Sequence, residues 1–207
     1  MEWTKVRILY NGSYGLVTLT VNSKNPNLPP IAMKSSRLED SHSLEKEKRI
    51  LDDLHGSPRI LMSLGNNVWV QFMKKGYVHC DLKPENILIV PLQDGTNYLK
   101  IADFELAKEP REEMQCGNSS MFRFHGTPLY MSPESFLFGQ IKSGLDIWSL
   151  SCVVVEMLTG KHVMQWLGGH RGWNFVLKEP YILEMSFLDN DFLRKCLARN
   201  LKDQWTA

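Results

Sequence analysis

The amino-acid sequence predicts an α+β protein with a small β-rich N-terminal part and a larger, mainly helical C-terminal part. Three observations predict this class. Residues 6–21 alternate apolar and polar side chains around two glycines, residues 43–54 have helical spacing, and apolar side chains beyond Pro133 recur every three or four positions. The 207 residues, 43% of them hydrophobic, are enough for one or two compact domains with a real core.

The N-terminal part is predicted to contain two or three antiparallel strands and one helix. Residues 6–21 have the alternation of a half-buried sheet, and the apolar run 31–34 follows a turn rich in Pro and Asn. From Ser43 to Leu54, leucine and isoleucine side chains are spaced as on one face of a helix, among Glu, Lys and Arg. We expect this amphipathic helix to pack on the strands.

The C-terminal part is predicted to begin with a hairpin and to continue as helices. Two short apolar runs, 87–90 and 99–102, flank the turn residues 93–97. The run 147–158 has helical spacing, and polar side chains interrupt it before it could span a bilayer, so it predicts a buried helix. A further helix is expected around residues 187–197.

Charge and cysteine content exclude several classes of function. Lys and Arg number 24 against 23 for Asp and Glu, so no field of one sign would attract nucleic acid or an anionic membrane. The four cysteines form no C-x-x-C pair, which argues against a zinc site or a disulfide framework. Because the N-terminus also lacks the layout of a signal peptide, we expect a cytoplasmic or nuclear protein.

The strongest functional signal is the segment His79–Leu88, His-Cys-Asp-Leu-Lys-Pro-Glu-Asn-Ile-Leu. It is followed by Asp103, 22 positions after Asp81. Phosphoryl transfer requires a carboxylate near the attacking hydroxyl, a cation on the migrating group, and an amide with a second carboxylate to hold Mg²⁺. Asp81, Lys83, Asn86 and Asp103 fit these roles, and a structural reason for crowding them in one loop is hard to find.

Two weaker signals lie in the N-terminal part. Gly12 and Gly15 flank a turn between strands, where missing side chains would let backbone N–H groups approach phosphate oxygens, although most such glycines only make turns. Lys34 ends an apolar strand and Glu47 lies on the predicted helix, so the two could form an ion pair across a cleft. A solvated surface lysine is the alternative interpretation of Lys34.

Taken in order, these segments resemble the protein kinase family, whose motifs include a glycine loop, an Ala-x-Lys strand, a His-Arg-Asp loop, Asp-Phe-Gly and Ala-Pro-Glu. Gly126–Glu134 is similar to the end of a kinase activation segment, and Asp146–Leu150 to the start of the central buried helix of the family. Lys83 and the Gly-Thr-Pro sequence at 126–128 resemble the serine/threonine class. The segments around 79–81, 148 and 205–207 resemble plant mitogen-activated protein kinase kinase kinases.

The resemblance implies a protein-kinase-like two-lobe fold, with an incomplete β-rich N-lobe at 1–67 and a mainly helical C-lobe at 68–207. It implies an ATP- and Mg²⁺-dependent serine/threonine kinase that phosphorylates a protein, such as a downstream kinase, in a signalling cascade. The implied catalytic residues are Asp81, Lys83, Lys34 and Glu47. The implied ATP-binding residues are Gly12, Ser13, Gly15, Val17, Ala32, Lys34 and Asn86. The implied Mg²⁺ ligands are Asn86 and Asp103.

The main departure from the family is an internal shortening. Lys34 and Asp81 are 47 positions apart, about half the usual separation, and the shortfall lies between Pro58 and Tyr77. In the family this stretch supplies the hinge that binds adenine and the helix that supports the catalytic loop. Residues 68–76 are interpreted as the tail of that helix, which leaves no hinge.

Three substitutions add to this departure. Glu105 replaces a glycine, which removes conformational freedom and adds a negative charge beside Asp103. Cys80 replaces the arginine that, in many kinases, pairs with a phosphorylated activation segment. Gln204 replaces an arginine that would pair with Glu134.

Three hypotheses follow from the sequence. The chain is an active kinase with shortened connections, as its retained catalytic side chains favour. Alternatively it is a non-catalytic kinase-like binding module, as Glu105, Cys80 and the missing hinge favour, or a splice or gene-model fragment of a longer kinase, as one contiguous loss favours. The missing architecture argues against turnover by this exact polypeptide.

Overall fold

The computed structural model describes residues 3–12, 15–37, 41–54, 75–109, 126–163, 193 and 195–198. The chain divides into two compact units, Met1–Asp52 and Asp53–Ala207. The predicted domain boundary between residues 67 and 68 lies outside the described residues and stays a prediction.

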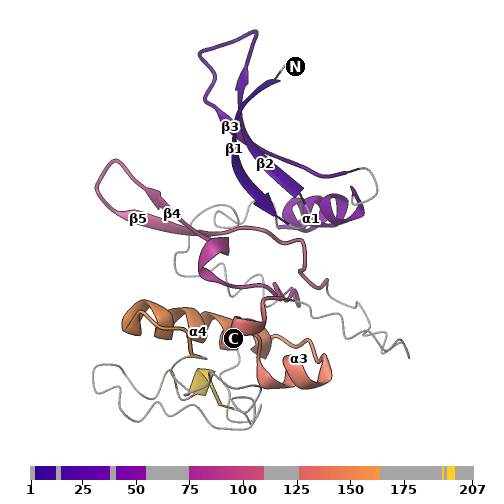
Figure 1. Ribbon diagram of the computed structural model, residues 1–207, viewed down its shortest axis with the longest axis vertical. Helices are drawn as coiled ribbons and strands as arrows, with labels where there is room; N and C mark the ends of the chain where they lie inside the picture. Colours follow the sequence, from indigo (N-terminus) through magenta and orange to yellow (C-terminus); the bar gives the residue numbers. More distant parts are fainter. Residues whose placement is uncertain are drawn as a thin grey trace. The chain divides into compact units, whose positions relative to one another are not determined.

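The first unit contains the predicted antiparallel sheet. Its strands are β1 (Trp3–Gly12), β2 (Gly15–Asn22) and β3 (Ile31–Ser35), paired in the order β1-β2-β3 (Figure 1). Buried threonines on β2 link it further to β3, because the Thr20 hydroxyl donates to the Ile31 carbonyl oxygen at 3.1 Å. The expectation of two or three antiparallel strands is confirmed.

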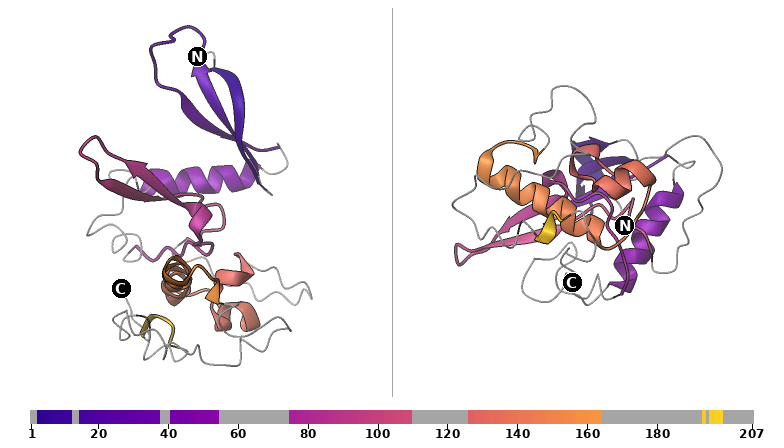
Figure 2. Two further views of the ribbon diagram at one scale, coloured as in Figure 1. Left: turned by 60° about the vertical axis from the view of Figure 1, so that its left-hand side comes forward. Right: turned by 90° about the horizontal axis from the view of Figure 1, so that it is seen from below.

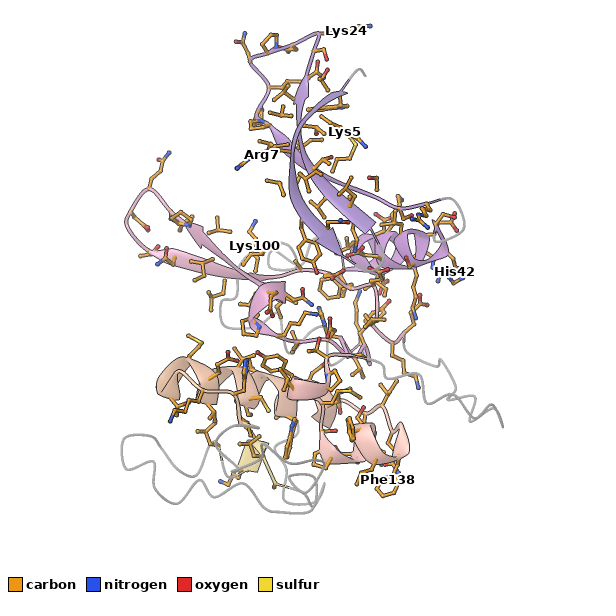
Figure 3. All side chains as sticks on the ribbon, viewed as in Figure 1. Lys5, Arg7, Lys24, His42, Lys100 and Phe138 are labelled. Carbon is orange, nitrogen blue, oxygen red and sulfur yellow. The ribbon has the colours of Figure 1, made fainter. Side chains whose placement is uncertain are left out.

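Two irregularities in the β1–β2 register shape this sheet. The pairing shifts between Lys5 and Arg7 and again between Ile8 and Tyr10. Such bulges increase the local twist of a sheet. The side chains of Lys5 and Arg7 extend from β1 into solvent (Figure 3).

Helix α1 (Ser41–Asp53) is the predicted amphipathic helix. It buries Ile50 completely and Glu47 almost completely, and its Lys48 and Asp52 form an exposed ion pair at 2.6 Å. The helix lies beside one end of the sheet (Figure 2). Its Glu47 side chain contacts Lys34 of β3. The predicted helix at 43–54 is therefore confirmed, and it begins two residues earlier than expected.

The second unit begins with the predicted hairpin. The short 3₁₀ helix η2 (Pro84–Asn86) leads into β4 (Ile87–Pro91), which pairs with β5 (Asn97–Ile101). The turn between them is closed by Asp94, whose Oδ1 accepts hydrogen bonds from the backbone N–H and the hydroxyl of Thr96. The hairpin prediction is confirmed.

The elements that follow β5 are helical where the structure describes them. They are the 3₁₀ helix η3 (Pro128–Tyr130), α3 (Pro133–Phe138) and α4 (Gly144–Thr159). Helix α4 has buried side chains on much of its circumference, and a core forms between it and residues on other segments. That core contains Tyr130, Trp148, Cys152, Val153, Val155, Val163, Leu193 and Leu197.

Both predictions for this region are confirmed where the structure describes it. Helix α4 is the buried helix expected at 147–158. In the later segment, the Leu197 N–H donates to the Leu193 carbonyl oxygen, which is one helical turn. None of the described helices combines the length and the apolar character needed to cross a membrane.

Candidate active site

Helix α4 holds the backbone of the loop that precedes η2. The carboxylate of Asp146, in the first turn of α4, accepts hydrogen bonds from the N–H groups of His79 at 2.7 Å and Cys80 at 3.0 Å. Burial raises the pKa of Asp146 to about 7, against the opposing effect of these two backbone donors. The loop is thus fixed to the core of its own unit.

The imidazole of His79 joins this loop to the segment that follows β5. Its Nε2 lies 3.1 Å from the carbonyl oxygen of Ala102, and its Nδ1 accepts from the Asp81 N–H at 3.3 Å. These partners assign the proton to Nε2. Complete burial lowers the pKa of His79 to about 4, so the ring is neutral at pH 7. The ring also packs on Phe104, with centroids 4.8 Å apart.

Asp81 stands at the centre of a polar cluster. Its Oδ2 lies 2.7 Å from Nζ of Lys83, and its Oδ1 accepts the hydroxyl hydrogen of Thr127 at 2.6 Å. Lys83 Nζ also donates to the Thr127 hydroxyl oxygen at 3.0 Å. The Asn86 side-chain amide donates to the Asp81 carbonyl oxygen at 2.8 Å. One carboxylate, one cation and one alcohol therefore meet at a single point.

The hairpin brings the two predicted Mg²⁺ ligands to the same end of the sheet. Ile87 pairs with Ile101, and the Ala102 N–H donates to the Asn86 carbonyl oxygen at 2.9 Å, so Asp103 follows directly. Because the Asn86 NH₂ group is engaged with Asp81, the amide oxygen is the atom that a cation would use. A carboxylate and an amide oxygen suit Mg²⁺, which keeps water and substrate phosphates as its other ligands.

This donor pair is smaller than a complete protein metal cage. Among the described residues, no group of three or more His, Cys, Asp or Glu side chains could hold a metal ion. Asp103 has a φ of 67°, a left-handed conformation that costs a non-glycine residue roughly 1–3 kcal/mol and is found most often at functional sites. Asn86 and Asp103 therefore fit an Mg²⁺ ion that is coordinated partly by the protein and partly by nucleotide phosphates.

Glu105, at the position where the family has glycine, is buried beside Phe104. Its Oε1 is buried and accepts no hydrogen bond from the described residues, although Glu105 as a whole does interact with its surroundings. Among the described residues the non-glycine positions with positive φ are Cys80 and Asp103, so the left-handed conformation falls on Asp103 and not on Glu105.

Cys80 has a structural contact in place of a charged side chain. It has a φ of 68°, and its thiol donates to the Val78 carbonyl oxygen at 3.4 Å. The carbonyl oxygen of Cys80 lies so close to Gly126 that a Cβ there would collide with it. Gly126, at a φ of 122°, is therefore required by the approach of two segments that are distant in the sequence.

The first unit carries the predicted ion pair. Lys34 Nζ on β3 lies 2.8 Å from Glu47 Oε2 on α1, and the two side chains are 25% and 11% exposed. Lys34 pairs across the sheet with Val17, and a Cβ on Gly15 would lie 3.0 Å from the carbonyl oxygen of Ser35. The ion pair is confirmed, and the solvated-lysine alternative is not supported. Its use in binding ATP stays a prediction.

The other predicted site residues divide between the two units. Gly12, Gly15, Val17, Ala32 and Lys34 lie on the strands of the first unit, Asn86 lies in the second, and Ser13 is outside the described residues. Gln204 is also outside them. The ATP-binding role of this set stays a prediction.

Sequence reasoning gave too little weight to two residues of the cluster. The sequence places Thr127 only within the Gly-Thr-Pro motif and Asp146 only at the start of a helix, whereas both form hydrogen bonds with the loop that contains residues 79–81. The Gly-Thr-Pro motif was the available signal for Thr127. Asp146 gave the weaker signal of a carboxylate in the first turn of a largely apolar helix.

Comparison with known proteins agrees with this geometry. The model of the protein kinase domain matches residues 70–207, which is more than half of the sequence, and the chain therefore belongs to the protein kinase family. Family membership classes it as an ATP-dependent serine/threonine protein kinase. The predicted kinase-like fold, with an incomplete small lobe, is confirmed.

Among its relatives are plant proteins. Mitogen-activated protein kinase kinase kinase 20 of Arabidopsis thaliana is 29% identical, over all of this chain and 76% of the relative. Mitogen-activated protein kinase kinase kinase 17 of the same plant is 27% identical, over all of this chain and 67% of the relative. The predicted likeness to this group of kinases is confirmed.

The alignments also bear on the internal shortening. The first extends over 264 positions, 57 more than the 207 residues of this chain, so the relative contains residues that this chain lacks. The family model matches from residue 70 onward, and the part with Lys34 and Glu47 precedes that match. The predicted place of the loss, between Pro58 and Tyr77, falls mostly outside the described residues.

Proposed function

We propose that this chain is the kinase domain of a mitogen-activated protein kinase cascade and that its catalytic loop activates a serine or threonine hydroxyl of a protein substrate. The Thr127 hydroxyl carries this proposal. It donates its hydrogen to Asp81 at 2.6 Å while Lys83 contacts the same oxygen at 3.0 Å. A substrate alcohol in an equivalent place would have its acceptor and its cation already positioned.

Each residue has a defined part in the proposed reaction. The substrate oxygen attacks the γ-phosphorus of ATP, its proton passes to Asp81, and ADP leaves. Lys83 stabilises the negative charge of the migrating group. Lys34, oriented by Glu47, would contact the α- and β-phosphates. Asn86 and Asp103 would hold Mg²⁺, which neutralises phosphate charge when it is bound.

The partner and the compartment are part of the proposal. The relatives are named as kinases that act on kinases of the same cascade, which supports a downstream protein kinase as the substrate. Cys80, Cys152 and Cys196 are buried free thiols among the described residues, which supports a reducing compartment, the cytoplasm or the nucleus. Microscopy of a fluorescent fusion of the 207-residue chain tests the location.

A second candidate is a kinase-like binding module without turnover. The buried Glu105, two residues from the proposed Mg²⁺ ligand Asp103, favours this candidate. A carboxylate at this position would add negative charge close to where the metal ion and the phosphates of ATP would bind. A third candidate is a fragment of a longer kinase. It is favoured because the alignment with mitogen-activated protein kinase kinase kinase 20 is 57 positions longer than this chain.

Thermal unfolding of the 207-residue chain, with and without Mg²⁺ and ATP, distinguishes these candidates. A ligand that binds only the folded state stabilises it by about 2.7 kcal/mol at a hundredfold excess over Kd. A cooperative transition that moves to higher temperature supports the kinase, with Asp81→Asn as a control that should bind ATP and transfer nothing. A cooperative transition that does not move supports the binding module, and the lack of a cooperative transition supports the fragment.

A further inference from the structure

A second polar cluster lies at the C-terminal end of α4. The Tyr130 hydroxyl donates to Glu156 Oε2 at 2.7 Å, and His162 Nδ1 lies 3.1 Å from that same oxygen. The Tyr130 hydroxyl oxygen and His162 Nδ1 are 3.4 Å apart, and the two rings meet edge to face with centroids 6.0 Å apart. Two side chains, Tyr130 from η3 and His162 from the segment after α4, therefore meet at one carboxylate oxygen of Glu156 on α4.

This cluster fixes Tyr130, which lies three residues after Thr127. Tyr130 donates its backbone N–H to the Thr127 carbonyl oxygen at 3.0 Å. Its own carbonyl oxygen accepts from the Ser149 hydroxyl of α4 at 2.7 Å. The ring is buried in the core around α4. The segment 127–131 is thus fixed to α4 at its backbone by Ser149 and at a side chain by Glu156.

The contact of His162 Nδ1 with Glu156 favours a hydrogen on that nitrogen. Glu156 Oε2 is an acceptor, so an imidazole nitrogen 3.1 Å from it without a hydrogen would repel it. Both the imidazolium and the neutral tautomer with hydrogen on Nδ1 avoid this repulsion. The Tyr130 hydroxyl stays protonated and therefore acts as a donor to Glu156. Burial is the larger cause, and the hydrogen bond to Glu156 the next, that raises the pKa of Tyr130 above its ordinary value.

We propose that His162 is a positioning residue, which donates its Nδ1 hydrogen to Glu156 and so keeps that carboxylate on the Tyr130 hydroxyl and the segment 127–131 in place. In this arrangement Glu156 Oε2 receives two hydrogen bonds at once, and loss of the His162 donor removes one of them, so that the carboxylate is held less firmly on the Tyr130 hydroxyl. The effect on phosphoryl transfer rests on the proposed function of Asp81 and Thr127. The positioning of the segment does not.

The first test is the protonation of the ring itself. In ¹⁵N NMR spectra of the labelled 207-residue chain at pH 7.5, His162 should show a protonated Nδ1, with its signals assigned by their loss in His162→Asn. An unprotonated Nδ1 with hydrogen on Nε2, the form most common in water, would overturn the proposal.

The second test measures the segment through hydrogen exchange of the Tyr130 and Met131 amides, without ATP. His162→Ala should accelerate their exchange about fivefold, the factor for one ordinary hydrogen bond. His162→Asn, whose side-chain N–H can occupy the Nδ1 position, should restore the slow rate. Lys161→Ala, on the neighbouring exposed residue, is the matched control and should leave the rate unchanged.

The outcomes separate positioning from general stability and from catalysis. Unchanged exchange in His162→Ala, or equal acceleration in His162→Ala and His162→Asn, would overturn the proposal. The amides of Cys152 and Val153 in α4 should not change in any variant. Because the readout needs no nucleotide, a chain that transfers no phosphate would contradict the proposed function and leave this result intact.

Discussion

The two predicted ion pairs, one in each unit, are positioned by different elements, although both are shielded from solvent to a similar degree. The side chains of Lys83 and Asp81 are 20% and 10% exposed, and those of Lys34 and Glu47 are 25% and 11% exposed. Asp81 also accepts hydrogen bonds from the side chains of Thr127 and Asn86. Two residues earlier in the chain, the backbone N–H of His79 donates to the Asp146 carboxylate. The Lys34–Glu47 pair joins one strand to one helix.

The two pairs are therefore positioned by different parts of the chain. The catalytic loop obtains its geometry from α4 and from the loop of Thr127, all within the second unit. The Lys34–Glu47 pair obtains its geometry from the sheet and α1 of the first unit. The proposed internal loss falls between these two sets. The described contacts of Asp81 with Lys83, Thr127 and Asn86 therefore lie on the C-terminal side of the predicted loss.

The largest effect is expected from Asp146→Ala. The change leaves two buried N–H groups, of His79 and Cys80, without their acceptor, and each such loss costs about 1–3 kcal/mol. The free energy of unfolding in urea should fall by about 2–6 kcal/mol. Asp94→Ala, at the exposed hairpin turn, is the control. A loss below about 1 kcal/mol would show that α4 does not organise the catalytic loop.

The next effect is expected from Gly126→Ala. The added Cβ meets the Cys80 carbonyl oxygen, and the φ of 122° strains any side chain, so we expect a loss of about 2–3 kcal/mol. Gly95→Ala is the matched control, because it has a positive φ of 81° but open space around the added atom, and it should cost about 1 kcal/mol. Equal losses in the two variants would mean that backbone strain alone, and not contact with the catalytic loop, requires Gly126.

These two positions show what the sequence could and could not predict. The hairpin and α4 follow from local periodicity, and Asp81, Lys83 and Asn86 are recognisable because they are close in the sequence. The bonds from Asp146 to His79 and from Thr127 to Asp81 join residues far apart in the chain, so no local pattern contains them. The positive φ of Cys80 and Asp103 is likewise absent from any local pattern, because non-glycine residues adopt it uncommonly.

A smaller effect is expected in the pH dependence of stability. His79, with its pKa lowered from 6.5 to about 4, lowers the stability of the folded state as pH falls through that interval, because the unfolded chain then binds more protons. Asp146, with its pKa raised from 3.8 to about 7, acts in the opposite direction as pH falls between these values. The two contributions offset each other in the native chain.

Asp146→Asn removes one side of that balance. Between pH 6.5 and 4, the variant should lose stability more steeply than the native chain, by up to about 1.4 kcal/mol per pH unit. Urea unfolding at several pH values measures the two slopes. Parallel curves for variant and native chain would show that Asp146 does not bind a proton in this range.

The smallest effect on stability is expected from Lys34→Met, in the first unit. Because the Lys34 side chain is a quarter exposed, loss of its ion pair should cost less than about 1 kcal/mol. The same variant should abolish any stabilisation by Mg²⁺ and ATP in thermal unfolding. Stabilisation by ATP that persists in Lys34→Met would show that Lys34 does not contact the phosphates.

The most direct measurement of the central claim is transfer of the labelled γ-phosphoryl group of ATP to a serine- and threonine-containing protein, compared between the 207-residue chain and Asp81→Asn. We expect measurable transfer by the native chain, and loss of at least about a hundredfold in Asp81→Asn, the lower range for removal of a general base. Equal incorporation by both chains, or none by a native chain that folds and binds ATP, would contradict that claim.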